Sequence, residues 1–208
     1  VYGCWDDDAS IVAYKNAHGI ASNDELYGMF ITRTGKHVAE HGIAPILWQE
    51  AFLAWDRCTD AQKENFVFAE GTTFQVWSGD GSIISDITAR NFSAIASPDA
   101  YWYMDYATST WDVMYYYDPK AGLSAEQQAL LVGGEAVAFA EKIDDNNFDS
   151  ITQPRAAAVA HRGAPSHIDV VARGDLVRLR AHHVLAKVVR DRAVDRARSL
   201  ARRPGVEL

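Results

Sequence analysis

The sequence of 208 residues contains no long apolar run, only two cysteines and no glycine-rich phosphate-binding loop. The missing apolar run argues against a membrane span, which needs roughly 20 consecutive apolar residues. Cys4 and Cys58 allow at most one disulfide, so the sequence leaves the redox compartment open. His37 and His41 have i, i+4 spacing without a nearby third ligand motif, so we expect no metal site.

The start of the chain also lacks two common features. Residues 1–5 include no initiator Met and none of the charged and apolar segments of a signal peptide. We therefore expect a processed chain or a fragment. Asp6, Asp7 and Asp8 form a carboxylate run here, which we interpret as a solvated loop leading into a helix N-terminus.

Positive charge is scarce in most of the chain and concentrated at its end. Residues 1–172 carry 10 Lys and Arg against 24 Asp and Glu, whereas residues 173–203 carry 10 Lys and Arg against 3 Asp. A basic segment is typical of proteins that bind nucleic acid or acidic lipid. No aromatic residue follows Phe148, so the segment has no ring on which bases could stack. We predict a main domain over 1–172, a basic helical tail over 173–208, and no nucleic-acid partner.

Apolar strand-like segments alternate with helix-like ones. The predicted strands are 44–48, 73–77, 91–97 and 130–139, and the predicted helices are 23–40, 83–90, 124–129 and 154–160. Residues 98–122 are predicted as a long loop. Alternation of this kind indicates an α/β fold with a parallel sheet covered on both faces. Four strands are half of a (β/α)8 barrel, whose chemistry lies at the carboxyl ends of its strands.

Aromatic and carboxylate residues gather where the predicted strands end. Aromatic rings stack on the apolar faces of sugars, and carboxylates accept hydrogen bonds from sugar hydroxyls. Core packing explains any single Trp as well as binding does, but the set together favours a saccharide site. The residues concerned are Trp48, Gln49, Glu50, Trp77, Tyr103, Asp105, Phe139 and Glu141.

Five short stretches occur in one order and spacing that resembles a known family. They are Leu47-Trp48-Gln49-Glu50, Gln75-Val76-Trp77, Trp102-Tyr103-Met104-Asp105, Gly133-Gly134-Glu135-Ala136 and the Pro-Arg-Ala run at 154–160. The pattern resembles the second half of the catalytic barrel, about strands 5 to 8, of the β-N-acetylhexosaminidases of glycoside hydrolase family twenty. The resemblance covers roughly residues 1–162. It implies a C-terminal half of a (β/α)8 TIM barrel, with the helical tail beyond it.

The resemblance implies an exo-acting enzyme that removes terminal N-acetylglucosamine or N-acetylgalactosamine. In such enzymes the substrate's own acetamido oxygen attacks the anomeric carbon, an exception to the two-carboxylate scheme. Tyr103 matches the Tyr that hydrogen-bonds this oxygen and is the implied catalytic residue. The implied substrate-binding residues are Trp48, Trp77, Asp105, Phe139 and Glu141. The family implies no cofactor or metal, lysosomal, vacuolar or extracellular placement, and homodimers in many members.

This sequence departs from the family pattern in several places. It contains no Gly-Gly-Asp-Glu, because Gly133-Gly134-Glu135 belongs to the last strand. The resemblance therefore places the general acid and its Asp partner before Val1, in a missing N-terminal half that would be a necessary partner. Phe139 stands where the family usually has Trp. The chain alone is then expected to be inactive, and the alternative function is a non-catalytic saccharide-binding module.

Overall fold

The computed structural model describes residues 3–163. The predicted tail over 173–208 and the domain boundary before it lie outside the described residues. One sheet of four parallel strands, in the order β1-β2-β3-β4, confirms the predicted α/β class and strand direction. The strands are β1 (Ile46–Trp48), β2 (Thr73–Val76), β3 (Ser93–Ala96) and β4 (Leu131–Gly134).

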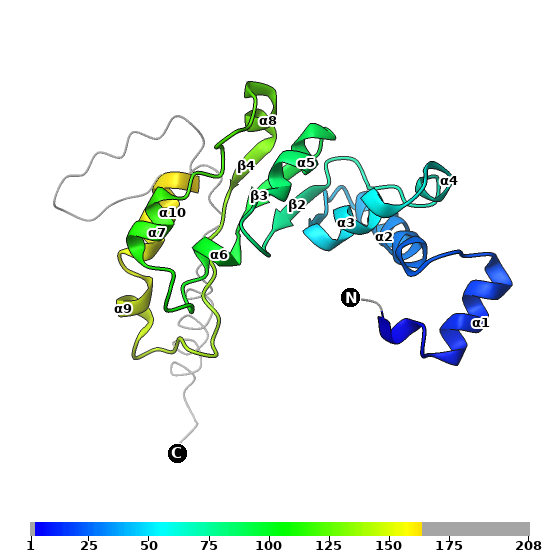
Figure 1. Ribbon diagram of the computed structural model, residues 1–208, viewed down its shortest axis with the longest axis horizontal. Helices are drawn as coiled ribbons and strands as arrows, with labels where there is room; N and C mark the ends of the chain where they lie inside the picture. Colours follow the sequence, from blue (N-terminus) through cyan, green and yellow to red (C-terminus); the bar gives the residue numbers. More distant parts are fainter. Residues whose placement is uncertain (1–2, 164–208) are drawn as a thin grey trace, which may run out of the picture.

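Helices connect the strands and flank the sheet. Figure 1 shows α2 and α3 on one side of the sheet and α7, α9 and α10 beyond β4 on the other. In chain order the helical elements are η1 (Gly3–Trp5), α1 (Ala9–His18), α2 (Asn23–Glu40), α3 (Gln49–Arg57), α4 (Asp60–Lys63), α5 (Ile83–Ala89), α6 (Asp99–Trp102), α7 (Trp111–Tyr116), α8 (Ala125–Leu130), α9 (Phe148–Thr152) and α10 (Arg155–Gly163). No helix among residues 3–163 is both long and apolar enough to cross a membrane.

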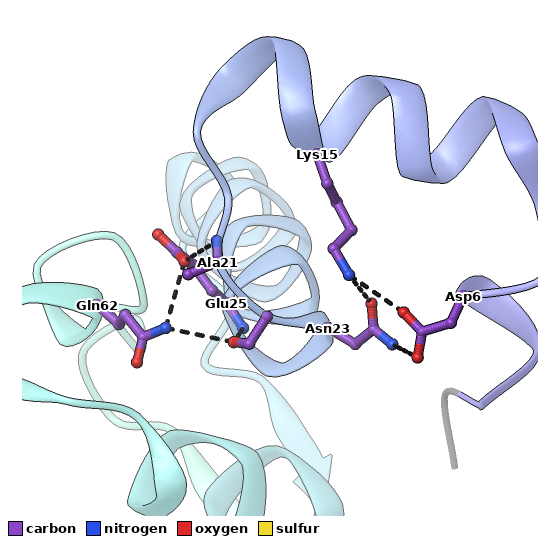
Figure 2. A network of polar contacts seen from close by, with 7 residues as sticks. Asp6, Lys15, Ala21, Asn23, Glu25 and Gln62 are labelled. Carbon is purple, nitrogen blue, oxygen red and sulfur yellow. Dashed lines mark hydrogen bonds and ion pairs between the residues drawn. The ribbon is translucent and has the colours of Figure 1, made fainter.

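The acidic run near the start of the chain braces the N-terminal helices. Asp8 caps α1 by accepting hydrogen bonds from the backbone N–H groups of Ser10 and Ile11. This agrees with the prediction that the acidic run leads into the N-terminus of a helix. Asp6 accepts hydrogen bonds from Lys15 and from Asn23, so it links η1 and α1 to the start of α2 (Figure 2). These carboxylates therefore have structural partners.

Several predicted boundaries agree with the structure, and others need correction. α2 spans 23–40 as predicted, and Ser124 and Gln127 form a capping box at α8. The predicted strand 130–139 is too long, because only residues 131–134 pair with β3. Residues 98–122 are not a continuous loop, because α6 and α7 form within them. Helices of four and six residues are too short to produce a clear hydrophobic period.

The two faces of the sheet differ, which corrects the prediction that both are covered. Successive residues of a strand point to opposite faces. On one face Phe74, Val76, Ala94 and Ala96 are fully buried against α3 and α5, with which their strands are in contact. On the other face every residue that has a side chain is half-buried or exposed. Its exposed apolar side chains are Ile46, Trp48 and Val132.

The covered face holds an aromatic core. Phe52 of α3 contacts Phe74 of β2 and Phe92 edge-on, with ring centroids 5.7 and 6.2 Å apart. Trp102 is also fully buried, and its indole N–H donates to the carbonyl oxygen of Met114. These rings stabilise the fold, so much of the aromatic content serves packing.

The turn before β3 also differs from expectation. Asn91-Phe92-Ser93 is a glycosylation sequon that we expected to be buried at the start of a strand. Asn91 is exposed and has φ 62°, in the turn between α5 and β3. Asn tolerates this left-handed conformation better than most residues, which explains its position after the helix.

Candidate active site

Two tryptophans form a wall at the carboxyl ends of the first two strands. Trp48 is the last residue of β1, and Trp77 directly follows β2. Their rings meet edge to face, with centroids 6.1 Å apart and planes at 80°. Trp48 is 53% exposed, so its ring is available to a ligand. The structure thus brings two of the predicted residues together.

The residues directly after Trp48 hold the segment that carries Trp77. The side-chain amide of Gln49 bonds both backbone groups of Ser78. Both carboxylate oxygens of Glu50 accept from the indole N–H of Trp77, at 2.9 and 3.0 Å. Gln49 and Glu50 belong to the predicted strand-end set and to the family pattern, but no individual role was predicted for either.

A second group of rings lies beyond the third and fourth strands. Tyr103 pairs with Val137 in an isolated parallel bridge, which aligns the segment after α6 with the segment after β4. The Tyr103 ring lies 5.6 Å from that of Phe139 and 5.5 Å from that of Tyr106, centroid to centroid. The contact between Tyr103 and Phe139 joins two predicted site residues, whereas Tyr106 was not predicted.

Burial strengthens the preference of the Tyr103 phenol for its protonated form, which any tyrosine has at neutral pH. The side chain is 4% exposed, and burial, followed by nearby Asp99, Tyr106 and Asp105, raises its pKa to about 12. Desolvation and neighbouring negative charge both disfavour a phenolate. Tyr103 is therefore a hydrogen-bond donor at neutral pH.

A half-buried pair, Gln75 and Glu135, lies between the tryptophan wall and the Tyr103 side of the site. Gln75 of β2, which is in register with Trp48, donates a hydrogen bond from its amide to the carboxylate of Glu135, just beyond β4. Burial raises the pKa of Glu135, and Glu135 is close enough to Tyr103 to contribute to the raised pKa of that phenol. The hydrogen bond spans β3 and links β2 to the segment after β4. The Gly-Gly-Glu stretch contained this signal, but the prediction assigned Glu135 only to a strand.

Asp105 offers a free acceptor. Its Oδ1 atom is buried and accepts no hydrogen bond within the described part of the chain. Burial lowers the pKa of Arg155 at the start of α10, and the Asp105 charge opposes this shift. A buried carboxylate oxygen without a donor is unfavourable unless a ligand supplies one. The atom is therefore suited to a ligand hydroxyl.

The structure does not bring every predicted residue into contact with the site. Glu141 lies in an exposed turn two residues after Phe139, and no hydrogen bond or ion pair within residues 3–163 ties it to the others. Phe139 itself is 45% exposed. Glu141 thus remains a prediction from the sequence pattern.

The two histidines with the spacing of metal ligands are neighbours in the structure. His37 and His41 lie side by side at the end of α2, with ring centroids 5.1 Å apart. No group of three or more His, Cys, Asp or Glu residues in the described ranges is arranged to hold a metal ion. Cys4 is exposed and Cys58 is buried, and both are free thiols.

The parallel sheet carries aromatic and carboxylate residues at the carboxyl ends of its strands, where α/β-barrel enzymes have their active sites. Residues 1–163 match the family described as Glycosyl hydrolase family 20, catalytic domain. The chain belongs to this family.

Individual relatives agree with this family. The chain is 28% identical over 160 residues to beta-hexosaminidase 3 of Arabidopsis thaliana, covering 76% of this chain and 28% of the relative. It is 29% identical over 169 residues to the beta-hexosaminidase subunit alpha of Mus musculus, covering 77% of this chain and 30% of the relative. The X-ray structure of Flavobacterium johnsoniae chitobiase superposes with a TM-score of 0.59 at 26% identity, covering 76% of this chain and 23% of that one. The chain thus spans less than a third of the length of these relatives.

Proposed function

We propose that this chain is the C-terminal half, about strands 5 to 8, of the (β/α)8 barrel of an exo-acting β-N-acetylhexosaminidase. The observation that carries the proposal is the site at the carboxyl ends of the strands, where the Trp48–Trp77 wall and Tyr103 lie to either side of the hydrogen-bonded pair Gln75 and Glu135. Family membership and the beta-hexosaminidase relatives support the same function. The enzyme removes terminal N-acetylglucosamine or N-acetylgalactosamine from glycans.

The uncovered sheet face supports a half barrel. Ile46, Trp48 and Val132 are exposed on it, and β1 and β4 form the two edges of the sheet in the described part of the chain. Exposed apolar faces and unpaired strand edges are unfavourable in a protein that remains alone in water. Four further strands from the rest of the protein would pair with these edges and close the face.

The proposed mechanism is substrate-assisted and retains anomeric configuration. The acetamido oxygen of the substrate attacks C1, the bond to the leaving oxygen breaks, and that oxygen takes a proton from a general acid. Water then attacks C1 from the face that the leaving group occupied, the bond between C1 and the acetamido oxygen breaks, and the water returns a proton to that acid. Tyr103 donates a hydrogen bond to the acetamido oxygen and holds it near C1, which raises the rate by positioning. The acid and its partner Asp are proposed to precede Val1.

The remaining site residues are proposed to bind the sugar. Trp48, Trp77 and Phe139 provide ring faces for the sugar and its acetamido methyl group. Asp105, with its unpaired Oδ1, accepts a hydrogen bond from an outer hydroxyl, and Glu141 has a similar role. A Phe at 139 keeps an aromatic wall but removes the N–H donor that Trp would supply.

Placement and assembly are part of the proposal. We infer a lysosomal, vacuolar or extracellular location, and homodimers as in many members of the family. The basic segment 173–208 is proposed to form a helix next to the barrel, and its charge has no proposed role in nucleic-acid binding.

The test is to express the full-length protein that contains this chain and to measure hydrolysis of an aryl N-acetyl-β-glucosaminide. Turnover that is lost when the upstream Asp-Glu pair is replaced by Asn-Gln supports the proposal. An intact protein with that pair present and no turnover would refute it. Binding of N-acetylglucosamine without hydrolysis, followed by tryptophan fluorescence, would instead favour a saccharide-binding module.

A further inference from the structure

The first turn of α3 contacts the tryptophan wall through two consecutive side chains. We propose that Gln49 and Glu50 are positioning residues that fix the indole of Trp77 for sugar stacking, Gln49 through the backbone and Glu50 through the ring. The inference rests on the proposed function for its kinetic part. It rests on contacts alone for its structural part.

The backbone part of the contact begins where strand pairing ends. Trp48 and Gln75 form the last pair between β1 and β2, and α3 starts at the residue after Trp48. The Gln49 amide donates to the Ser78 carbonyl at 3.3 Å and accepts from the Ser78 N–H at 3.0 Å. It therefore takes the place of the main-chain partner that a longer β1 would have provided. Gln49 is 7% exposed, so water does not compete for these groups.

The segment around Trp77 is also held from the β3 side. The backbone N–H of Asp99 donates to the carbonyl of Trp77 at 2.8 Å, and the Asp99 carboxylate accepts from the backbone N–H of Gly79 at 2.7 Å. Residues 77–79 are thus bonded from both neighbouring connections. The Cα position of Trp77 is fixed before its side chain is considered.

Glu50 then fixes the ring. A Trp side chain rotates about two bonds, and a hydrogen bond at the indole nitrogen restricts both of them. The Trp77 N–H points between the two Glu50 oxygens, at 2.9 and 3.0 Å. A hydrogen bond to an ionised acceptor is about twice as strong as one between neutral groups. The edge-to-face contact with Trp48 supports the ring from another side.

This arrangement exceeds what packing requires. A carboxylate that is half-buried beside apolar rings loses hydration, and that loss is unfavourable unless a donor replaces the water. Phe at position 77 would fill a similar space without needing a carboxylate. The Glu50 contact is specific to an indole held at one angle, and the angle of the ring decides how it stacks on a sugar.

The experiment uses the full-length protein with Glu50→Ala, Glu50→Gln and Gln49→Ala, and with Glu70→Ala as the matched control. Glu70 is an exposed acid in the turn before β2, outside the site. Glu50→Ala should raise KM for the aryl N-acetylglucosaminide roughly tenfold, equal to about 1.4 kcal/mol, with kcat changed less than threefold. Glu50→Gln should raise KM only about threefold, because its neutral amide oxygen accepts the same N–H with roughly half the strength.

A second measurement does not depend on activity. The indole N–H of Trp77, assigned in the NMR spectrum with Trp77→Phe, should exchange with solvent at least fivefold faster in Glu50→Ala and in Gln49→Ala than in Glu70→Ala. Unchanged exchange in Glu50→Ala, or equal KM losses in Glu50→Ala and Glu50→Gln, would overturn the inference. Wild-type protein without hydrolysis would refute the proposed function, and the exchange rates would still decide the role of Glu50.

Discussion

Replacing Tyr103 by Phe separates catalysis from folding with unusual clarity in this site. The change removes one oxygen atom from a side chain that is 4% exposed. The ring keeps its contacts with Tyr106 and Phe139. No side-chain hydrogen bond from the Tyr103 hydroxyl occurs within residues 3–163, so the replacement leaves no buried partner unsatisfied. We therefore expect the free energy of unfolding to change by less than about 1 kcal/mol.

The expected effect on catalysis is much larger. With a pKa of about 12, only about one Tyr103 in 10⁵ is ionised at pH 7, so almost every molecule has the donor in place. Removing one preorganised donor at a developing charge lowers kcat by roughly 10²- to 10³-fold, or about 3 to 4 kcal/mol. We expect a loss in this range for Tyr103→Phe.

The assay compares kcat and KM of the full-length wild type with those of Tyr103→Phe, using an aryl N-acetyl-β-glucosaminide. Tyr116→Phe is the control, because Tyr116 is 73% exposed and lies on α7. Thermal unfolding of all three proteins establishes that they are folded. A folded Tyr103→Phe protein with kcat within twofold of wild type would refute the role of the phenol as donor.

Three further predictions concern the site and the packing. Burial raises the pKa of Glu135 above its ordinary 4.5, so the folded state keeps this proton to higher pH than the unfolded state does. The protonated carboxyl therefore stabilises the folded state at low pH, and this stability is lost as pH rises from 4.5 through the raised pKa. The unfolding midpoint of wild type should therefore fall relative to that of Glu135→Gln as the pH rises from 4 to 8. A difference between the two midpoints that stays constant over this range would contradict this. Asp105 should repel an anionic sugar, so kcat/KM should be higher for a neutral substrate than for a 6-sulfated one. Asp105→Asn should bring these two kcat/KM values closer together. Equal kcat/KM values for the two substrates in the wild type would contradict the prediction. A methyl group at Gly28 would lie 2.3 Å from the Phe66 ring, so Gly28→Ala should lower the free energy of unfolding in urea by about 1 to 3 kcal/mol. A methyl group at Gly35 would lie 3.4 Å from that of Ala69, so Gly35→Ala should be neutral or stabilising. Similar urea midpoints for both variants would disprove the packing argument.

Local sequence signals predicted the four strands, four of the helices and the residues at strand ends. The bounds of α2 and the capping box at Ser124 follow from interactions within one helix, so a single sequence contains them. Trp48 and Trp77 were predicted together because each ends a predicted apolar strand, and parallel strands end on the same edge. The short helices α6 and α7 were missed because their positions depend on packing against the rest of the fold.

The sequence alone did not predict which polar side chains are partners when they lie far apart in the chain. The Gln75–Glu135 pair joins residues 60 positions apart across an intervening strand. Neither residue has a local pattern that identifies its partner. The exposure of Asn91 was also mispredicted, because the strand begins two residues later than expected. The five stretches of the family pattern identified the site region, but the contacts within it required the fold.

The absence of any loop residue between β1 and α3 has a consequence for how the site can diversify. An insertion between Leu47 and Gln49 would shift Gln49 and Glu50 away from Ser78 and Trp77, so this wall does not tolerate a change of length. The segment between β3 and β4 has over thirty residues and carries Tyr103, and surface connections accept insertions readily. Enzymes that share this architecture should therefore adapt to new glycans by changing length on the Tyr103 side, while the tryptophan side keeps a constant spacing.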